Sequence, residues 1–484
     1  MKDIVRNSFL LTLTEFALII LAIFRNKVVA ITIGPEGLGI YGLLNSYFAI
    51  LMVASATWMC SIVVKYIAEY KYCDDFDSVN NVINITLIVS FVISVILIFF
   101  SLLFRDYIIG VFFNGKIILD YYIIFSFSCI GFALKAIFNS ILQGLLNISS
   151  TVRYRIITTI IEIIITILMV FYFHIIGFII SFVLSSIVHI IYIIHFLKNQ
   201  KWYKFKIDLN DRSLISKMFN FGKLNIFLSV ISSITQYYQR IITTINLNIA
   251  FVGYFQASQS IMNYMGILNR STTFTMLPLM SEEININDRN IKLNEYIRFT
   301  ILSNAFISIL TVIFSNNLIR ILYAASFTEL DKFISLFILA QFMISIELIF
   351  QATVLGMSLF KVHLLSSIIN IVLWLVIPMI FIKKIGFTSI PLSLIIASFF
   401  AVVVELFFLK KIKGVSILNY NYLIFGVSIL LIILSSLLKF EFFYQKILEV
   451  IVLLSLFIFT LNKKEKLLIK SKIKSKLISI KKSA

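Results

Sequence analysis

Runs of about 20 apolar residues repeat along almost the whole chain, and this pattern limits the fold more than any other feature. A run of that length is what an α-helix needs to cross the hydrocarbon core of a bilayer. About fourteen such runs occur, from residues 8–32 to residues 446–462. Charged residues make up only 13% of the chain, about half the share of a soluble domain. The sequence therefore predicts an all-α polytopic membrane protein with about 14 transmembrane helices, and it excludes a soluble enzyme.

The charge pattern predicts how the chain is oriented in the membrane. The net charge is +19, and most basic residues lie in alternate short loops and in the tail at 463–484. Cytoplasmic loops of membrane proteins carry such an excess of Lys and Arg. We therefore expect both termini to be cytoplasmic, which requires an even number of helices. Because topology explains the positive charge, we expect no nucleic-acid partner.

The sequence offers no pattern for catalysis or for a cofactor. The three cysteines, Cys60, Cys73 and Cys129, form no C-x-x-C motif and no cluster with histidine. The phosphate-binding pattern G-x-x-x-x-G-K-[ST] does not occur. We expect no catalytic residues, no metal site and no cofactor, so any energy for transport would come from the membrane potential, an ion gradient or consumption of the product.

Two weak alignments indicate an internal repeat. Lys27 aligns with Arg240 at an offset of 213, and Gly144 aligns with Gly356 at an offset of 212. Many transporters consist of two such related halves. Each half would contain six spans. Because six is an even number, both halves would insert the same way up, with a pseudo-twofold axis along the membrane normal. The predicted organisation is an N-lobe at 1–200, a C-lobe at 201–415, two further helices at 416–462 and a basic cytoplasmic tail at 463–484.

Several basic side chains lie inside apolar runs, where an ionised group is costly unless it lines a cavity or forms an ion pair. Lys27 and Arg240 lie toward the outer ends of their runs, and Lys65 and Arg270 lie toward the inner ends. If these runs face one cleft, the cations form two levels across the membrane. Arg25, in the first run, is a further candidate cation. This arrangement suits an anion that crosses in steps. The competing interpretation is that these long side chains reach the lipid headgroups.

Other polar residues in the runs are candidates for binding or for ion coupling. Gln256 and Gln259 share one helix face and are expected to hydrogen-bond a sugar. Lys135 and Glu347 occupy equivalent repeat positions, 212 residues apart, so they either pair directly or bond locally within each lobe. Glu15, in the first run, is a further candidate for a charge pair or for coupling. The histidines are expected at the membrane interface rather than in a proton relay: His174, His189, His195 and His363.

Four segments resemble those of a known family. Residues 34–41 read GPEGLGIY and residues 64–70 read VKYIAEY, while VGYFQ at 252–256 and LPL at 277–279 belong to the second lobe. These segments resemble bacterial polysaccharide flippases of the O-antigen translocase type, within the multidrug/oligosaccharidyl-lipid/polysaccharide exporter superfamily. The likeness covers most of the first twelve predicted spans.

The resemblance implies an exporter-superfamily (MATE-like) fold and a flippase in the bacterial inner membrane. Its expected substrate is an undecaprenyl-pyrophosphate-linked oligosaccharide, moved from the inner to the outer leaflet by alternating access through a cationic cavity. The family cations correspond to Lys27, Lys65 and Arg240, and the family glutamine to Gln256. The resemblance also implies membrane lipid and a polysaccharide polymerase with its chain-length machinery as partners.

Two other functions remain open from the sequence. A cation-coupled multidrug antiporter of the same fold would use acidic residues deep in one lobe, and Glu15, Glu162, Glu347 and Glu405 keep it open. A membrane polysaccharide polymerase usually carries a sizeable outer loop, and the predicted outer loops here are short. The basic character of most charges near the expected cleft favours the flippase.

Overall fold

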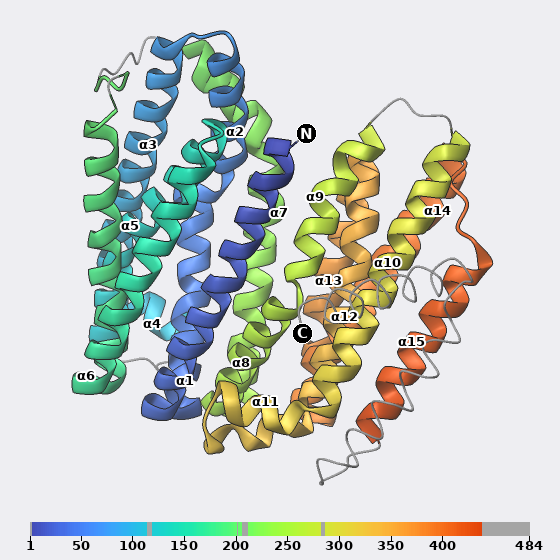
Figure 1. Ribbon diagram of the computed structural model, residues 1–484. Coiled ribbons are helices and arrows are strands. Elements are labelled where there is room, and N and C mark those ends of the chain that lie inside the picture. The colour runs from blue at the N-terminus through green and yellow to red at the C-terminus, as the bar shows by residue number, and fades with distance from the viewer. Residues whose placement is uncertain (1, 114–118, 201, 206–211, 282–285, 438–484) are drawn as a thin grey trace, which may run out of the picture. The chain divides into compact units, whose positions relative to one another are not determined.

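The computed structural model describes residues 2–113, 119–200, 202–205, 212–281 and 286–437 (Figure 1). Within these ranges the chain is helical and has no strand, as the apolar runs predict. The predicted last span at 446–462 and the basic tail at 463–484 lie outside the described residues. The long helices, in chain order, are α1 (Lys2–Met52), α2 (Trp58–Tyr72), α3 (Phe76–Leu103), α5 (Leu119–Gly144), α6 (Ile148–Lys198), α7 (Arg212–Asn246), α8 (Ile249–Met265), α9 (Ile267–Ser281), α10 (Ile286–Ile313), α12 (Ile334–Gly356), α13 (Phe360–Ile385), α14 (Ser389–Lys413) and α15 (Asn419–Leu437).

Shorter helices join some of these. They are a π-helical turn η1 (Val53–Thr57) between α1 and α2, α4 (Arg105–Phe113), α11 (Ser315–Leu322), η2 (Ala325–Lys332) and η3 (Gly386–Thr388). Eight helical segments of the described chain are long and apolar enough to cross a membrane. Three of them exceed 50 residues, about twice the length that one crossing needs. The multi-pass character is therefore established, while the count of fourteen stays a prediction.

Two of the longest helices contain a sharp turn. Gly34 in α1 adopts a φ of 65°, which favours glycine, and Pro35 then restarts the helix. His174 in α6 adopts a φ of 50°, and a Cβ at Gly177 would come closer than 3.0 Å to the Met169 carbonyl. Eight residues of straight helix span about 12 Å, so this approach means that α6 folds back as a hairpin. Each arm of the hairpin is long enough to cross a membrane.

Side-chain caps fix where some helices start. Asp75 accepts hydrogen bonds from the Ser78 backbone N–H at 3.0 Å and from the Ser78 hydroxyl at 2.5 Å, which caps α3. These bonds, from the hydroxyl first, lower the pKa of the Asp75 carboxyl below its usual range. Asn147 caps α6 in the same way, since its side chain accepts from the Ser150 N–H at 3.1 Å. Both caps are residue types that satisfy the first free N–H groups of a helix.

The chain divides into two compact units. The first unit contains residues up to Tyr264 together with Ile319–Leu330 and Ser367–Ala397. The second contains Met265–Leu318, Asp331–Ser366 and the described residues from Ser398 to Leu437. These units follow packing rather than chain order, because α7 and α8 group with the first 200 residues. The predicted lobes at 1–200 and 201–415 stay a prediction.

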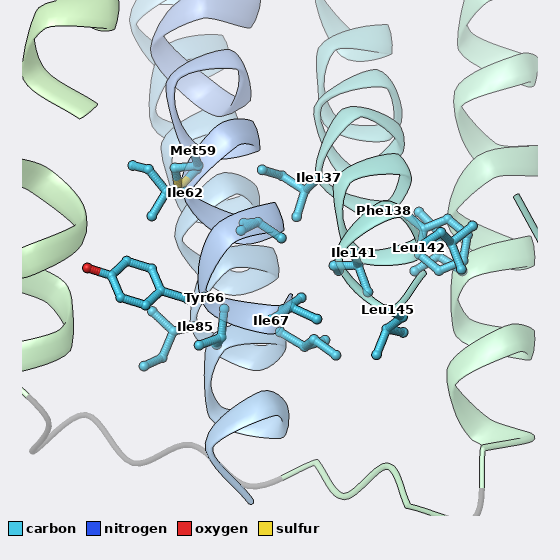
Figure 2. Packing of buried hydrophobic residues seen from close by; sticks show 14 of the residues in the cluster. Met59, Ile62, Tyr66, Ile67, Ile85, Ile137, Phe138, Ile141, Leu142 and Leu145 are labelled. Atoms are coloured by element: carbon cyan, nitrogen blue, oxygen red, sulfur yellow. The ribbon is translucent and has the colours of Figure 1, made fainter. Parts of the chain in front are cut away.

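The first unit has a dense apolar core between α2, α3, α5 and α6 (Figure 2). The cluster includes Met59, Ile62 and Tyr66 of α2 together with Ile137 and its neighbours of α5, and Figure 2 draws these side chains as sticks. The spacing of three and four residues places each set on one helix face. Lipid tails are as apolar as these side chains, so close van der Waals packing rather than exclusion of water stabilises this core.

The second half of α1 packs closely against α8 within the first unit. A Cβ at Gly39 would come closer than 3.0 Å to the Ile249 carbonyl oxygen, and one at Gly253 would meet the Pro35 carbonyl oxygen equally closely. At the offset of 213, residues 249 and 253 correspond to residues 36 and 40. The contact is therefore nearly self-complementary, the pattern that a twofold relation between repeats produces. This supports the internal repeat.

Candidate functional site

A buried guanidinium lies at the junction of α1, α7 and α8. Arg240, on α7, is 2% exposed. Its Nη1 donates to the Gly42 carbonyl and to Ser46 Oγ at 2.7 Å, both on α1. Its Nη2 donates to Gln256 Oε1 at 2.8 Å and to Gln259 Oε1 at 2.6 Å, both on α8. The three residues Arg240, Gln256 and Gln259, which we predicted as binding residues, are therefore brought together.

The partners of Arg240 are all neutral. Within the described residues no carboxylate lies within ion-pair distance of this guanidinium, and its Nε has no hydrogen-bond partner. The ring of Phe255 lies 5.7 Å from the guanidinium carbon and adds a cation–π contact. Dipoles alone compensate a buried charge poorly, because desolvation costs several kcal/mol per ion. This environment favours the approach of an anion.

Arg25, on α1, is half-buried. Arg25 Nη2 has one long hydrogen bond, 3.5 Å to Asn26 Oδ1, and Arg25 Nε has no partner among the described residues. Asn26 in turn donates to the Tyr264 hydroxyl of α8 at 2.8 Å. Arg25 is thus a second cation that has no carboxylate partner among the residues that the structure describes.

Lys27 contacts backbone carbonyls rather than the side chains around Arg240. Its Nζ donates to the backbone carbonyls of Arg320 and Tyr323, at the end of α11. The last carbonyls of a helix lack partners and carry partial negative charge, so a cation stabilises them. Tyr323 is itself anchored, since its hydroxyl donates to the Ala257 carbonyl of α8 at 3.1 Å. Lys27 therefore caps α11, and it also has no carboxylate partner within the described part of the chain.

The other two predicted cations differ from these three. Lys65, on α2, is exposed, and its Nζ lies 5.2 Å from the centre of the Tyr66 ring. Arg270 belongs to α9 in the second unit, and its side chain lies outside the described residues. The two levels of cations across the membrane therefore stay a prediction. We call Arg25, Lys27 and Arg240 the cationic cluster.

Lys135 and Glu347 have separate partners, each within its own unit. Lys135 Nζ, on α5, forms an ion pair of 2.7 Å with Glu162 Oε1 of α6. Glu347, on α12, accepts a hydrogen bond of 2.8 Å from Gln351 Nε2 on the same helix. Sequence reasoning did not find Glu162 as the partner, because only the folding of α5 against α6 brings residues 135 and 162 together.

Glu15 also has a specific partner. Its Oε1 lies 2.5 Å from Arg155 Nη1, so the start of α1 is tied to the first half of α6. Both side chains are about a third exposed or less.

No group of three metal-ligating side chains occurs among the residues that the structure describes.

His189 lies in the interior of the first unit, and its predicted place at the membrane interface stays a prediction. Its side chain is fully buried, with Nδ1 at 3.1 Å from the Tyr154 hydroxyl and Nε2 at 2.7 Å from Glu162 Oε1. The sequence did not indicate this contact, because Tyr154 and Glu162 lie on one arm of the α6 hairpin and His189 lies on the other. Helical periodicity relates only residues of the same helical arm.

Comparison with known proteins identifies the family. A family model described as "Polysaccharide biosynthesis protein" matches residues 4–284, more than half of the chain. The protein belongs to this family. A search of curated protein sequences found no match.

Solved structures show the fold. The lipid II flippase MurJ, in an inward closed conformation, superposes with a TM-score of 0.71 at 19% identity, covering 93% of this chain and 98% of that one. An inward-facing multidrug resistance MATE family transporter gives 0.67 at 15% identity, covering 82% of this chain and 96% of that one. A MOP superfamily transporter from Pyrococcus furiosus gives 0.59 at 13% identity, with 84% and 96% covered. The chain therefore shares the fold of these three solved proteins.

Proposed function

We propose that the protein is a flippase for undecaprenyl-pyrophosphate-linked oligosaccharide repeat units of a surface polysaccharide such as O-antigen. It would move them from the inner to the outer leaflet by alternating access. The family supports a role in polysaccharide biosynthesis, and a lipid II flippase shares the fold. The positive-inside pattern supports a multi-pass protein of the bacterial inner membrane with cytoplasmic termini. A polysaccharide polymerase with its chain-length machinery would receive the product.

The cationic cluster carries this proposal. Arg25, Lys27 and Arg240 all belong to helices of the first unit, and none of them has a carboxylate partner in the described chain. Cations without counter-ions at membrane depth usually belong to a substrate pathway. The planar fork of an arginine matches a pyrophosphate oxygen pair, and amide oxygens such as those of Gln256 and Gln259 are weaker acceptors that an anion can displace. The cluster therefore favours an anionic headgroup.

One observation favours the cation-coupled antiporter as the second candidate. In the second unit Glu405 is fully buried, its Oε1 accepts from Ser366 Oγ at 2.7 Å, and its Oε2 has no hydrogen-bond partner among the described residues. Glu347 lies within electrostatic reach of it. Two buried acidic groups suit a cation, so this unit fits an antiporter better than the first unit does.

Transbilayer movement in proteoliposomes tests the proposal. The substrate is a fluorescent undecaprenyl-pyrophosphate oligosaccharide, and the variants are Arg240→Ala, Arg240→Lys and the control Arg105→Gln, which removes an exposed cation paired only with Asp106. We expect wild type and the control to flip the lipid, Arg240→Lys to flip it slowly, and Arg240→Ala to lose flipping. If the wild-type protein exchanged organic cations but moved no lipid, the antiporter proposal would replace the flippase proposal.

A further inference from the structure

A second polar network lies in the first unit, apart from the cationic cluster. Glu162 Oε1 lies 2.7 Å from both Lys135 Nζ and His189 Nε2. His189 Nδ1 lies 3.1 Å from the Tyr154 hydroxyl. The histidine is fully buried, and the Glu162 side chain is 11% exposed. We call Lys135, Glu162, His189 and Tyr154 the Glu162 network.

The fold aligns these residues by close backbone packing. Tyr154 and Glu162 lie on the first arm of α6, His189 lies on the second arm, and Lys135 lies on α5. A Cβ at Gly131 would come closer than 3.0 Å to the Ser186 carbonyl, so α5 and the second arm are nearly in contact. Lys135 lies one turn after this contact and His189 lies just under one turn after it. The network is thus held in place by the α5–α6 packing.

The charges of the network balance when the imidazole is neutral. The Lys135 ammonium and the Glu162 carboxylate cancel, and in the tautomer with the proton on Nε2 the Tyr154 hydroxyl donates to Nδ1. Imidazole is the side chain whose charge ordinarily changes between pH 5 and pH 8. The network can therefore take up one further proton, provided that the tyrosine hydroxyl turns and accepts.

Among the described residues, the groups that pack around the network are aromatic or already paired. On α6, Tyr192 packs against the Tyr154 ring at 4.9 Å. On α5, the Phe132 ring lies 5.0 Å from Lys135 Nζ and 5.4 Å from the His189 ring. From α1, Glu15 is held by Arg155. Helices α2 and α3 pack on α5, and in the described chain they bring no charged side chain into ion-pair distance of the network.

We propose that the Glu162 network is the proton-binding site that couples flipping to the transmembrane proton gradient. A proton adds to His189 Nδ1, and the Tyr154 hydroxyl changes from donor to acceptor. The imidazolium then shares the Glu162 carboxylate with Lys135, which weakens the ion pair. Lys135 is 27% exposed and is the member that can move away. Loss of the same proton restores the pair, and the inference rests on the proposed flippase function.

Gradient-driven flipping tests the coupling. Proteoliposomes carry the fluorescent lipid-linked oligosaccharide and an imposed pH difference. The variants are His189→Gln, Glu162→Gln and the control His195→Gln, which changes a histidine of the same helix whose Nε2 is hydrogen-bonded to Asn199. One pH unit of gradient changes a one-proton step by up to about tenfold. We expect that acceleration in wild type and in the control, and its loss in the other two.

A second readout needs no substrate. Histidine C2–H deuterium exchange, followed by mass spectrometry across pH 5 to 8, reports whether His189 takes up a proton in the folded protein, with His195 as the internal reference. We expect His189 to titrate, and Tyr154→Phe to move its titration to lower pH because an acceptor for the imidazolium is lost. Tyr154→Phe preserves the ring packing, so it serves if His189→Gln fails to fold.

These two measurements separate the possible failures. Wild-type flipping that ignores the pH gradient, or a His189 that does not titrate, would overturn the coupling site and leave a structural brace. A wild-type protein that moves no lipid-linked sugar would remove the proposed function. In that case His189 titration alone decides whether the network binds a proton.

Discussion

The close approach of α1 and α8 allows a sharp prediction about Gly39. This glycine belongs to the segment at 34–41 that indicated the family, and its backbone packs on the Ile249 carbonyl. Replacing it by alanine puts a methyl group closer than 3.0 Å to that oxygen. The obstacle is backbone rather than a movable side chain, so the two helices must separate by about 1 Å. The Arg240 side chain hydrogen-bonds to both of these helices, so moving them apart also lengthens its hydrogen bonds.

The size of the effect follows from two opposing terms. Overpacking costs about 1–3 kcal/mol, and a clash with backbone belongs at the upper end. Alanine favours the helix over glycine by about 1 kcal/mol. We therefore expect Gly39→Ala to destabilise the protein by about 2 kcal/mol. Gly253→Ala opens the same gap from the other side, so the double variant should lose less than the sum of the two single variants.

Thermal unfolding in detergent, with denaturant unfolding as a second probe, measures this prediction. Gly110→Ala is the matched control, because no atom lies within 4 Å of the Cβ position in α4. The control should be neutral or more stable by up to about 1 kcal/mol. Equal stability of Gly39→Ala and Gly110→Ala would refute the packing argument. Strictly additive losses in the double variant would refute the shared gap.

Three further predictions concern single interactions. Lys27→Met removes the cap of α11 and should lower the unfolding free energy by about 0.5–1 kcal/mol, whereas Lys27→Arg should retain most of it; denaturant unfolding compares the two. Asp75→Ala removes the α3 cap and should cost about 1 kcal/mol at pH 7. The pKa of Asp75 is lower in the folded state than in the unfolded chain. The stability difference between wild type and Asp75→Ala is therefore fully present above the unfolded-state pKa and is lost as the pH falls through the folded-state pKa. Unfolding experiments at pH 7 and pH 3 measure this loss. Glu15→Arg and Arg155→Glu should each reduce stability, and the double reversal should restore much of it; independent losses in that cycle would contradict the pair.

Much of the fold was predictable because membrane insertion leaves a simple signal. The apolar runs predicted an all-helical multi-pass protein, and the spacing of Gln256 and Gln259 predicted their common face. Each of these features is local, so sequence periodicity reports it directly.

The partners of the buried charges could not be predicted in this way. Glu162 lies 27 residues from both Lys135 and His189, and only the α5 packing and the α6 hairpin bring them together. Arg240 was predicted to line a cavity, but in this structure neutral groups of two neighbouring helices surround it. Such contacts depend on tertiary packing, which no single helix encodes.

The central claim is that the first unit recognises an anionic lipid headgroup. The most direct test compares binding of undecaprenyl-pyrophosphate oligosaccharide with that of an undecaprenyl glycoside lacking phosphate, using the protein in lipid nanodiscs. The account predicts tighter binding of the pyrophosphate lipid, a preference that weakens at high salt and disappears in Arg240→Ala but not in Arg105→Gln. Equal binding of the two lipids, or a preference that survives removal of Arg240, would contradict it.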